Sequence, residues 1–278
     1  PRRDTIMAIR SIISAYSGRQ ARGAGLRHAI RIAKHHNAEL YGALRHGRPL
    51  LERQYRAQLS DDILAILRKT DTDHISEVEQ RFNEIVSAAG LPTEGRFIEH
   101  DPQVEGRLSE LAHGFDLVVM GMYPDDATEA HLSAHPDLVA LRSGRPVLVV
   151  PDGYEAEGLA ERAIIAWDGK RAATRAIGDA MDLLADKAEV TLLSVGDVKP
   201  RYTDLVLANM ARHGINAKAA TVEKDGSIAH TLLAEAVSRD AKLIVMGAYE
   251  HSKFTHDLFG GVTTDLLRDT MVPVLMAH

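Results

Sequence analysis

The 278-residue sequence contains no cysteine. This absence excludes disulfides, thiolate metal sites and thiol catalysis, and it fits a reducing compartment. No run approaches the roughly 20 consecutive apolar residues that a membrane-spanning helix needs. The beginning of the sequence shows no pattern typical of a secretion signal. We therefore expect a cytoplasmic protein that does not use a membrane as partner.

An excess of basic residues is also missing. The 39 Asp and Glu residues outnumber the 33 Lys and Arg residues, which gives a formal net charge of −6. A chain with this balance has no long-range attraction to nucleic acid or to an anionic membrane. We therefore predict no nucleic-acid partner.

Common catalytic motifs are absent as well. The sequence contains no Gly-x-Ser-x-Gly, no Walker lysine motif and no His-Glu-x-x-His. His131 and His135 have the spacing of the last motif, but Leu132 stands where it needs glutamate. The adjacent His35 and His36 lie at a predicted helix end, where positive charge is favourable, and we interpret them as structural. We predict no catalytic residue and no metal site.

An internal repeat is the strongest pattern in the sequence. Residues 115–123 (FDLVVMGMY) align with residues 241–249 (AKLIVMGAY), and residues 145–150 (RPVLVV) align with residues 272–277 (VPVLMA). The two alignments have nearly the same offset, which predicts two copies of one domain.

Two domains are predicted from this repeat, at residues 1–151 and 159–278. The acidic segment between them contains proline and glycine and is typical of an exposed linker. Weaker matches upstream indicate that the first copy is the longer one. We place a helical insertion at about residues 48–90 of this copy.

Apolar runs alternate with amphipathic segments in the second copy. We predict strands at residues 163–167, 190–195, 215–222, 243–246 and 272–276. We predict helices at residues 171–184, 202–213 and 227–237, and a fourth around 263–268. Such alternation predicts an α/β fold in which helices cover a parallel sheet, because parallel strands need crossover connections.

Three segments of the second copy are expected to meet at the carboxyl edge of this sheet, where ligands of such folds bind. They are Asp168-Gly169 after the first strand, Val195-Gly196 after the second, and residues 247–264 after the fourth. Glycines of the last segment would let backbone approach phosphate, and the helix that follows would offer free N–H groups. Asp168 would accept hydrogen bonds from ribose hydroxyls. We expect Trp167 to pack in the core and not to stack on a ligand.

At these residues the sequence resembles the universal stress protein family. The resemblance is most specific at residues 245–247 (VMG), 259–263 (FGGVT) and 273–275 (PVL). Nucleotide-binding members of that family carry Gly-x₂-Gly-x₉-Gly followed by Ser or Thr. They also carry an Asp after the first strand and use a backbone position of the second strand against adenine. The resemblance implies two Rossmann-like domains related by a pseudo-twofold and an adenine-nucleotide-binding role in the stress response, without catalysis.

Carried over position by position, the family pattern gives a candidate site in the second domain. The matching positions are Asp168, Val195, Gly247, Gly260, Val262 and Thr263. Two positions depart from the pattern: Glu250 stands at the second glycine, and Gly261 stands at the Ser or Thr. Two unit charges 4 Å apart interact by about 4 kcal/mol at an effective dielectric constant near 20. An inward-pointing Glu250 would therefore abolish triphosphate binding, whereas an outward one would do much less.

The first copy departs further from the family pattern. We align Arg10 with the strand-one carboxylate, Pro124 with the second glycine and Ala134 with the third. We therefore predict that the nucleotide site of the first domain is degenerate and that this domain serves as a scaffold. The resemblance also implies that Val147–Val150 pairs with Val274–Ala277 within the chain.

Three functional alternatives stay open at this point. The second domain binds ATP, ADP or AMP; or both pockets have decayed and the chain is an interaction scaffold; or the protein is a weak ATPase, for which Glu250 is the single candidate group. The sequence also leaves open a homodimer of the whole chain.

Overall fold

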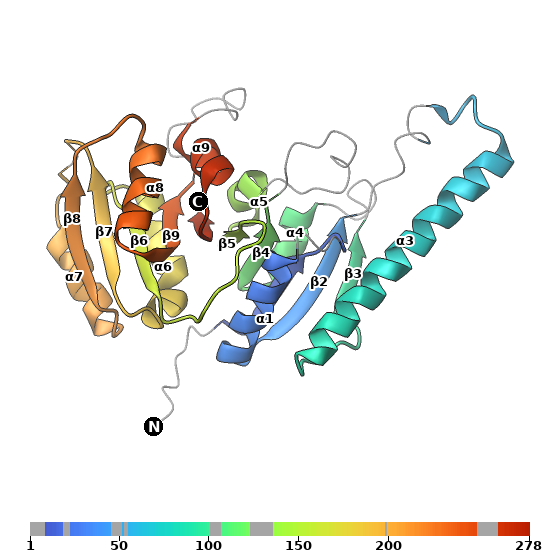
Figure 1. Ribbon diagram of the computed structural model, residues 1–278, viewed down its shortest axis with the longest axis horizontal. Helices are drawn as coiled ribbons and strands as arrows, with labels where there is room; N and C mark the ends of the chain where they lie inside the picture. The colour runs from blue at the N-terminus through green and yellow to red at the C-terminus, as the bar shows by residue number, and fades with distance from the viewer. Residues whose placement is uncertain are drawn as a thin grey trace.

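Ten strands in the described part of the chain pair into one sheet (Figure 1). The structure, a computed structural model, describes residues 9–18, 23–45, 52, 55–100, 107–122, 136–197, 199–248 and 261–278. The strand order across the sheet is β3-β2-β1-β4-β5-β10-β9-β6-β7-β8.

The first half of the chain supplies one side of this sheet. Its elements are β1 (Ser11–Ala15), α1 (Ala24–His36), β2 (Glu39–Arg45), α3 (Asp61–Ala88), β3 (Phe97–His100), α4 (Leu108–Leu111), the 3-10 turn η2 (Ala112–Gly114), β4 (Leu117–Gly121), α5 (Pro136–Ser143) and β5 (Val147–Val150).

The second half supplies the other side. Its elements are β6 (Arg162–Ala166), α6 (Arg171–Ala185), β7 (Val190–Val195), α7 (Thr203–Arg212), β8 (Ala217–Val222), α8 (Ile228–Ser238), β9 (Ala241–Gly247), α9 (Val262–Asp269) and β10 (Val274–Ala277). These bounds agree with the elements predicted for the second copy to within about two residues at either end.

A pseudo-twofold relates the two halves. Each contributes five strands in the same spatial order, and the second set runs in reverse across the sheet. The halves meet where β5 pairs with β10 antiparallel, with Leu148 opposite Leu275, whereas the strand pairs within each half are parallel. The predicted fold of two Rossmann-like domains in tandem is confirmed, and so is the pairing of their fifth strands. The domain boundaries at 1–151 and 159–278 stay a prediction.

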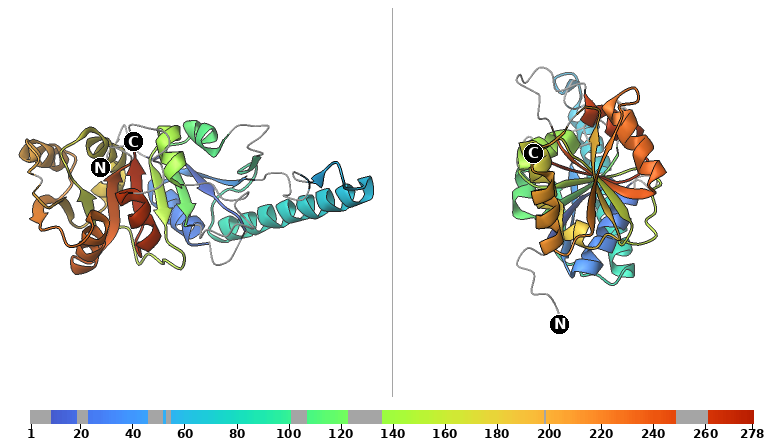
Figure 2. Two further views of the ribbon diagram at one scale, coloured as in Figure 1. Left: turned by 90° about the horizontal axis from the view of Figure 1, so that it is seen from above. Right: turned by 90° about the vertical axis from the view of Figure 1, so that its left-hand side faces the viewer.

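The central strands are apolar along their whole length because helices cover both faces of the sheet (Figure 2). All four residues of β5 and all four of β10 are buried. Leu148 and Leu275 belong to the core on one face, and Val149 and Val274 belong to the core on the other. Both cores therefore run across the junction between the halves. Burial of each such side chain contributes about 1.5–3 kcal/mol to the stability of the fold.

The long helix α3 distinguishes the first half, because α7 takes the same place in the second half and is far shorter. Figure 1 shows α3 extending away from the sheet. The helix lies within the predicted insertion. Phe82 anchors it: a Cβ on Gly42 of β2 would lie 2.6 Å from the Phe82 ring. Within the described residues, no helix is both long and apolar enough to cross a bilayer.

Candidate functional site

The sheet brings three of the predicted site positions to one edge. β6 lies between β7 and β9, with Ala166 paired to Leu193 and Ile165 paired to Val245. Asp168, Val195 and Gly247 therefore follow or end neighbouring parallel strands at their carboxyl ends. Glu250 and Gly260 lie outside the described residues.

Asp168 forms a turn at this edge. Its Oδ1 accepts a hydrogen bond from the Lys170 backbone N–H at 3.0 Å, and its Oδ2 lies 3.4 Å from the Lys170 ammonium nitrogen. Gly169 between them has φ +78°, in the region that glycine favours. The Asp168 side chain is 37% exposed, so the carboxylate serves the turn and stays accessible from solvent.

Gly247 is required by packing. A Cβ at this position would lie 2.5 Å from the Ala172 carbonyl carbon and 2.6 Å from the Ala173 nitrogen in the first turn of α6. The first half makes the same kind of contact, because a Cβ on Gly25 of α1 would lie 3.0 Å from the Gly121 nitrogen. From the sequence, we expect glycines of this segment to approach phosphate. For Gly247 the helix contact is a sufficient reason in itself.

The segment predicted to approach phosphate, residues 247–264, continues into α9. Gly261 is the residue before this helix, with φ +138°, and no heavy atom lies within 4 Å of a Cβ built there. Val262 begins the helix, and Thr263 is 8% exposed. α9 connects β9 to the parallel strand β10, so it runs back across the sheet and begins at the carboxyl edge. Its N–H groups are thus oriented toward the edge that carries Asp168.

Trp167 packs in the core, as predicted. Its ring is 5% exposed, and its Nε1 donates a hydrogen bond to the Thr203 hydroxyl at 3.0 Å. Its carbonyl oxygen accepts a hydrogen bond from the Ser194 hydroxyl at 2.8 Å. These bonds tie the end of β6 to β7 and to the start of α7.

Sequence reasoning missed the part that Pro200 and Thr203 play at this edge. Thr203 donates a hydrogen bond to the Pro200 carbonyl at 3.1 Å, and a Cβ on Gly169 would lie 2.7 Å from the Pro200 Cβ. The loop after β7 therefore closes on the Asp168-Gly169 turn. A proline three residues before a threonine at a helix start was the available signal.

The alignment of Arg10 with the strand-one carboxylate is wrong. Arg10 precedes β1, and its backbone N–H donates to the Asp116 carboxylate at the amino edge of the sheet. The register of β1 against β4 instead makes Ser17-Gly18 the counterpart of Asp168-Gly169. Pro124 and Ala134 lie outside the described residues.

Helix α3 covers this counterpart turn in the first half. Gly18 has φ +77°, as its partner does, but a Cβ there would lie 2.6 Å from the Val78 side chain. The Arg81 guanidinium donates a hydrogen bond to the Gly18 carbonyl, and Ser17 is buried. The first half thus has a buried hydroxyl where the second has a partly exposed carboxylate.

Residues 160–278 match the family model described as Universal stress protein family. A universal stress protein of Synechocystis sp. is 26% identical over 179 residues, which are 60% of this chain and 60% of that protein.

Two solved structures share the architecture over nearly the whole chain. A universal stress protein from Archaeoglobus fulgidus superposes with a TM-score of 0.69 at 17% identity, over 96% of this chain and 95% of that one. A universal-stress-type protein from Pseudomonas aeruginosa gives a TM-score of 0.58 at 15% identity, over 98% and 94%. The second half of the chain, residues 160–278, thus matches the universal stress protein family in sequence, and the whole chain shares its tandem fold with these two structures.

Proposed function

We propose that the second half binds an adenine nucleotide (AMP, ADP or ATP) and that the protein acts in the stress response by binding and not by catalysis. The observation that carries the proposal is the meeting of Asp168, Val195 and Gly247 at the carboxyl ends of three adjacent strands. Ligands of open parallel sheets bind at this edge.

The nucleoside would contact the ends of β6 and β7. The Asp168 carboxylate is accessible and can accept hydrogen bonds from both ribose hydroxyls. The backbone at Val195, at the end of the neighbouring strand, would face the adenine ring. The loop that Pro200 closes over Gly169 would flank the base.

The phosphates would lie toward the start of α9. The first N–H groups of a helix have no partner within the helix, and its dipole favours an anion there. Gly261 puts no side chain in front of those groups. The Lys170 ammonium, beside Asp168, adds a positive charge at the same edge.

The first half would serve as scaffold in this proposal. Ser17 replaces the carboxylate, and Val78 and Arg81 of α3 lie against the turn that would contact ribose. Its fifth strand pairs with that of the binding half.

A second candidate function is a scaffold with no nucleotide site. The contacts between Asp168 and Lys170 favour it, because they already engage both carboxylate oxygens. Catalysis has less support, since Glu250 is the single group we would assign to an ATPase and it lies outside the described residues.

Acid extraction of the purified protein tests the proposal. We expect co-purified adenylate, or else binding of AMP, ADP or ATP by calorimetry with one site per chain. If the protein carries no nucleotide and binds none of the three, the nucleotide-binding proposal is wrong and the scaffold function is supported.

A further inference from the structure

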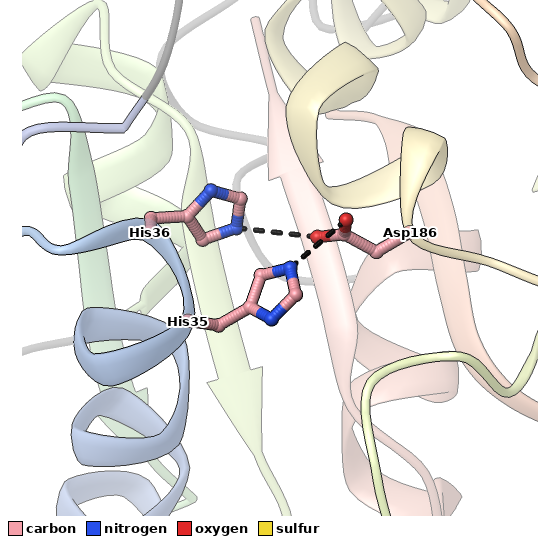
Figure 3. Close-up of side chains that lie close together, drawn as sticks. All are labelled: His35, His36 and Asp186. Carbon is pink, nitrogen blue, oxygen red and sulfur yellow. Dashed lines mark ion pairs between the residues drawn. The ribbon is translucent and has the colours of Figure 1, made fainter. Parts of the chain in front are cut away.

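Three side chains away from the candidate nucleotide site meet where the two halves face each other (Figure 3). His35 and His36 end α1, and Asp186 follows the last residue of α6. The His35 Nε2 lies 3.0 Å from the Asp186 Oδ1, and the His36 Nε2 lies 3.4 Å from the Asp186 Oδ2. One ligand atom from each residue can be chosen so that all three lie within 4.8 Å of one another.

The pseudo-twofold explains this meeting. α1 and α6 are equivalent helices, and the aligned segments that follow them, Asn37-Ala-Glu and Lys187-Ala-Glu, make His36 and Asp186 equivalent residues. A residue near a twofold axis faces its own counterpart. Because the two copies differ here, an imidazole faces a carboxylate across the junction.

Two adjacent histidines on a helix normally diverge, since successive side chains differ by about 100° around the axis. Here the helix ends at His36, and Asn37 adopts φ 53° in the left-handed region. The two rings lie nearly perpendicular, with centroids 4.9 Å apart. Figure 3 shows both imidazoles directed at the one carboxylate.

The cluster contains unpartnered polar atoms. The His36 side chain is 10% exposed, and its Nε2 has no hydrogen-bond partner among the described residues. The Asp186 Oδ2 opposite it is buried and unpartnered as well. Buried polar atoms nearly always have a partner, so two such atoms facing each other at 3.4 Å indicate a third species between them.

The donor set selects that species. Two imidazole nitrogens and one carboxylate oxygen are typical ligands of Zn²⁺, which leaves its fourth position to water in open sites. Ligand atoms around a tetrahedral zinc with bonds of about 2.0–2.1 Å are separated by about 3.4 Å. The separation from His35 Nε2 to Asp186 Oδ1 is 3.0 Å and that from His36 Nε2 to Asp186 Oδ2 is 3.4 Å. Each is close to this spacing, and a set with one carboxylate oxygen has all its ligand atoms within 4.8 Å of one another. The missing cysteines exclude thiolate zinc sites but not this kind.

The local charge also favours a dication. The Asp186 carboxylate lies within 3.0–3.4 Å of both imidazole Nε2 atoms. Asp182, one turn earlier on α6, also interacts with His36 and Asp186. With neutral imidazoles, two carboxylates leave the cluster negatively charged.

We propose that His35, His36 and Asp186 form a site for Zn²⁺, or for a divalent transition ion with the same donor preference, that joins α1 of one half to α6 of the other. Both helices run antiparallel to the strands, so their carboxyl ends lie at the amino edge of the sheet. The metal site is thus at the edge opposite the candidate nucleotide site and does not depend on it.

Calorimetric titration of chelator-treated protein with Zn²⁺ tests the proposal, using wild type, His36→Gln and Asp186→Asn. Both substitutions keep the side-chain volume nearly constant. His230→Gln is the matched control, because His230 Nδ1 lies 3.9 Å from an Asp225 carboxylate oxygen without a second histidine. We expect one ion per wild-type chain, unchanged binding by the control, and at least tenfold weaker binding by the other two variants. Equal affinity in all four proteins would overturn the proposal.

Cobalt and pH separate a metal site from a plain ion pair. Co²⁺ bound in a tetrahedral site absorbs visible light, and we expect this band in wild type and its loss in Asp186→Asn. We expect binding of Zn²⁺ to weaken at least tenfold from pH 7.5 to 5.5, because imidazole ligands must be neutral. Besides the three ligands, Asp182, Asp116, His213 and Lys187 contribute to the charge around this cluster. Stabilisation that Zn²⁺ does not alter and that strengthens on acidification would identify an ion pair and contradict the metal site.

Discussion

Gly247 of β9 and Ala172 of α6 approach so closely that a Cβ on the glycine would lie 2.5 Å from the alanine carbonyl carbon. This contact sets how closely the first turn of α6 packs on the strand that ends at the candidate site. It also predicts that Gly247→Ala lowers the free energy of unfolding by about 1–3 kcal/mol, the usual cost of overpacking. Urea denaturation measures this change.

Gly178→Ala is the control for that substitution. Gly178 lies within α6, and a Cβ there has no heavy atom within 4 Å. We expect this variant to raise the free energy of unfolding by about 0.5–1 kcal/mol, because alanine favours helix. A Gly247→Ala protein as stable as wild type would show that α6 does not approach β9 this closely.

Restoring the family's serine at Gly261 is predicted to be unfavourable. The position is open, but its φ of +138° is one that L side chains rarely adopt. We expect Gly261→Ser to destabilise the protein by about 1 kcal/mol or more through backbone strain. Gly158→Ser, at a position where φ is not positive, is the control and should be nearly neutral. A Gly261→Ser protein more stable than wild type would show that the backbone before α9 can adopt a conformation without this strain.

His28 predicts a pH dependence of stability. Burial, aided by the charges of Lys187 and Arg31, lowers the pKa of His28 to about 4. Its ring packs edge-on against Tyr154 in the segment between the halves, with centroids 5.8 Å apart. In the unfolded chain a histidine has a pKa of about 6.5, so the unfolded state binds more protons between these two pH values.

Stability should therefore fall as the pH falls from about 6.5 to 4. The full loss from this histidine is about 3 kcal/mol, because each pKa unit corresponds to about 1.4 kcal/mol. We expect urea denaturation in the presence of a metal chelator to show that the free energy of unfolding depends less steeply on pH in His28→Gln than in wild type over this range. An identical slope in the two proteins would show that His28 is not buried in its neutral form.

The second half could be predicted from the sequence almost element by element. Its apolar runs are bounded by turn residues such as Gly196 and Gly214. Local patterns of this kind predict the helices and strands, and the packing of the folded protein leaves them unchanged. The repeat predicted the tandem fold for a similar reason, because the largely buried strands β4 and β9, and likewise β5 and β10, have similar sequences.

The sequence did not locate β1 correctly. Two short apolar runs stand near the beginning, and the earlier one suggested that Arg10 follows the strand. Pairing with β2 and β4 selects the later run, Ser11–Ala15. The better local signal was Gly18, whose positive φ matches that of Gly169.

The meeting of His36 with Asp186 had no local signal at all. It depends on how the two halves are placed by the pairing of β5 with β10, which brings the ends of two distant helices together. Similarly, the cover that Val78 and Arg81 give to the Ser17-Gly18 turn follows from the direction of α3 and not from any motif.

Binding of adenine nucleotide by Asp168→Asn, compared with Asp240→Asn, tests the central claim most directly. Asp240 also has a lysine two residues later, with an ion pair of 2.6 Å to Lys242, but it precedes β9 at the opposite edge of the sheet. Loss of charged hydrogen bonds to ribose costs about 1.5–3 kcal/mol, so calorimetry with AMP, ADP and ATP should show roughly tenfold to hundredfold weaker binding for Asp168→Asn. Wild-type affinity is expected for Asp240→Asn. Equal nucleotide affinity in the two variants, or none in the wild-type protein, would contradict a nucleotide site at the carboxyl edge of the second half.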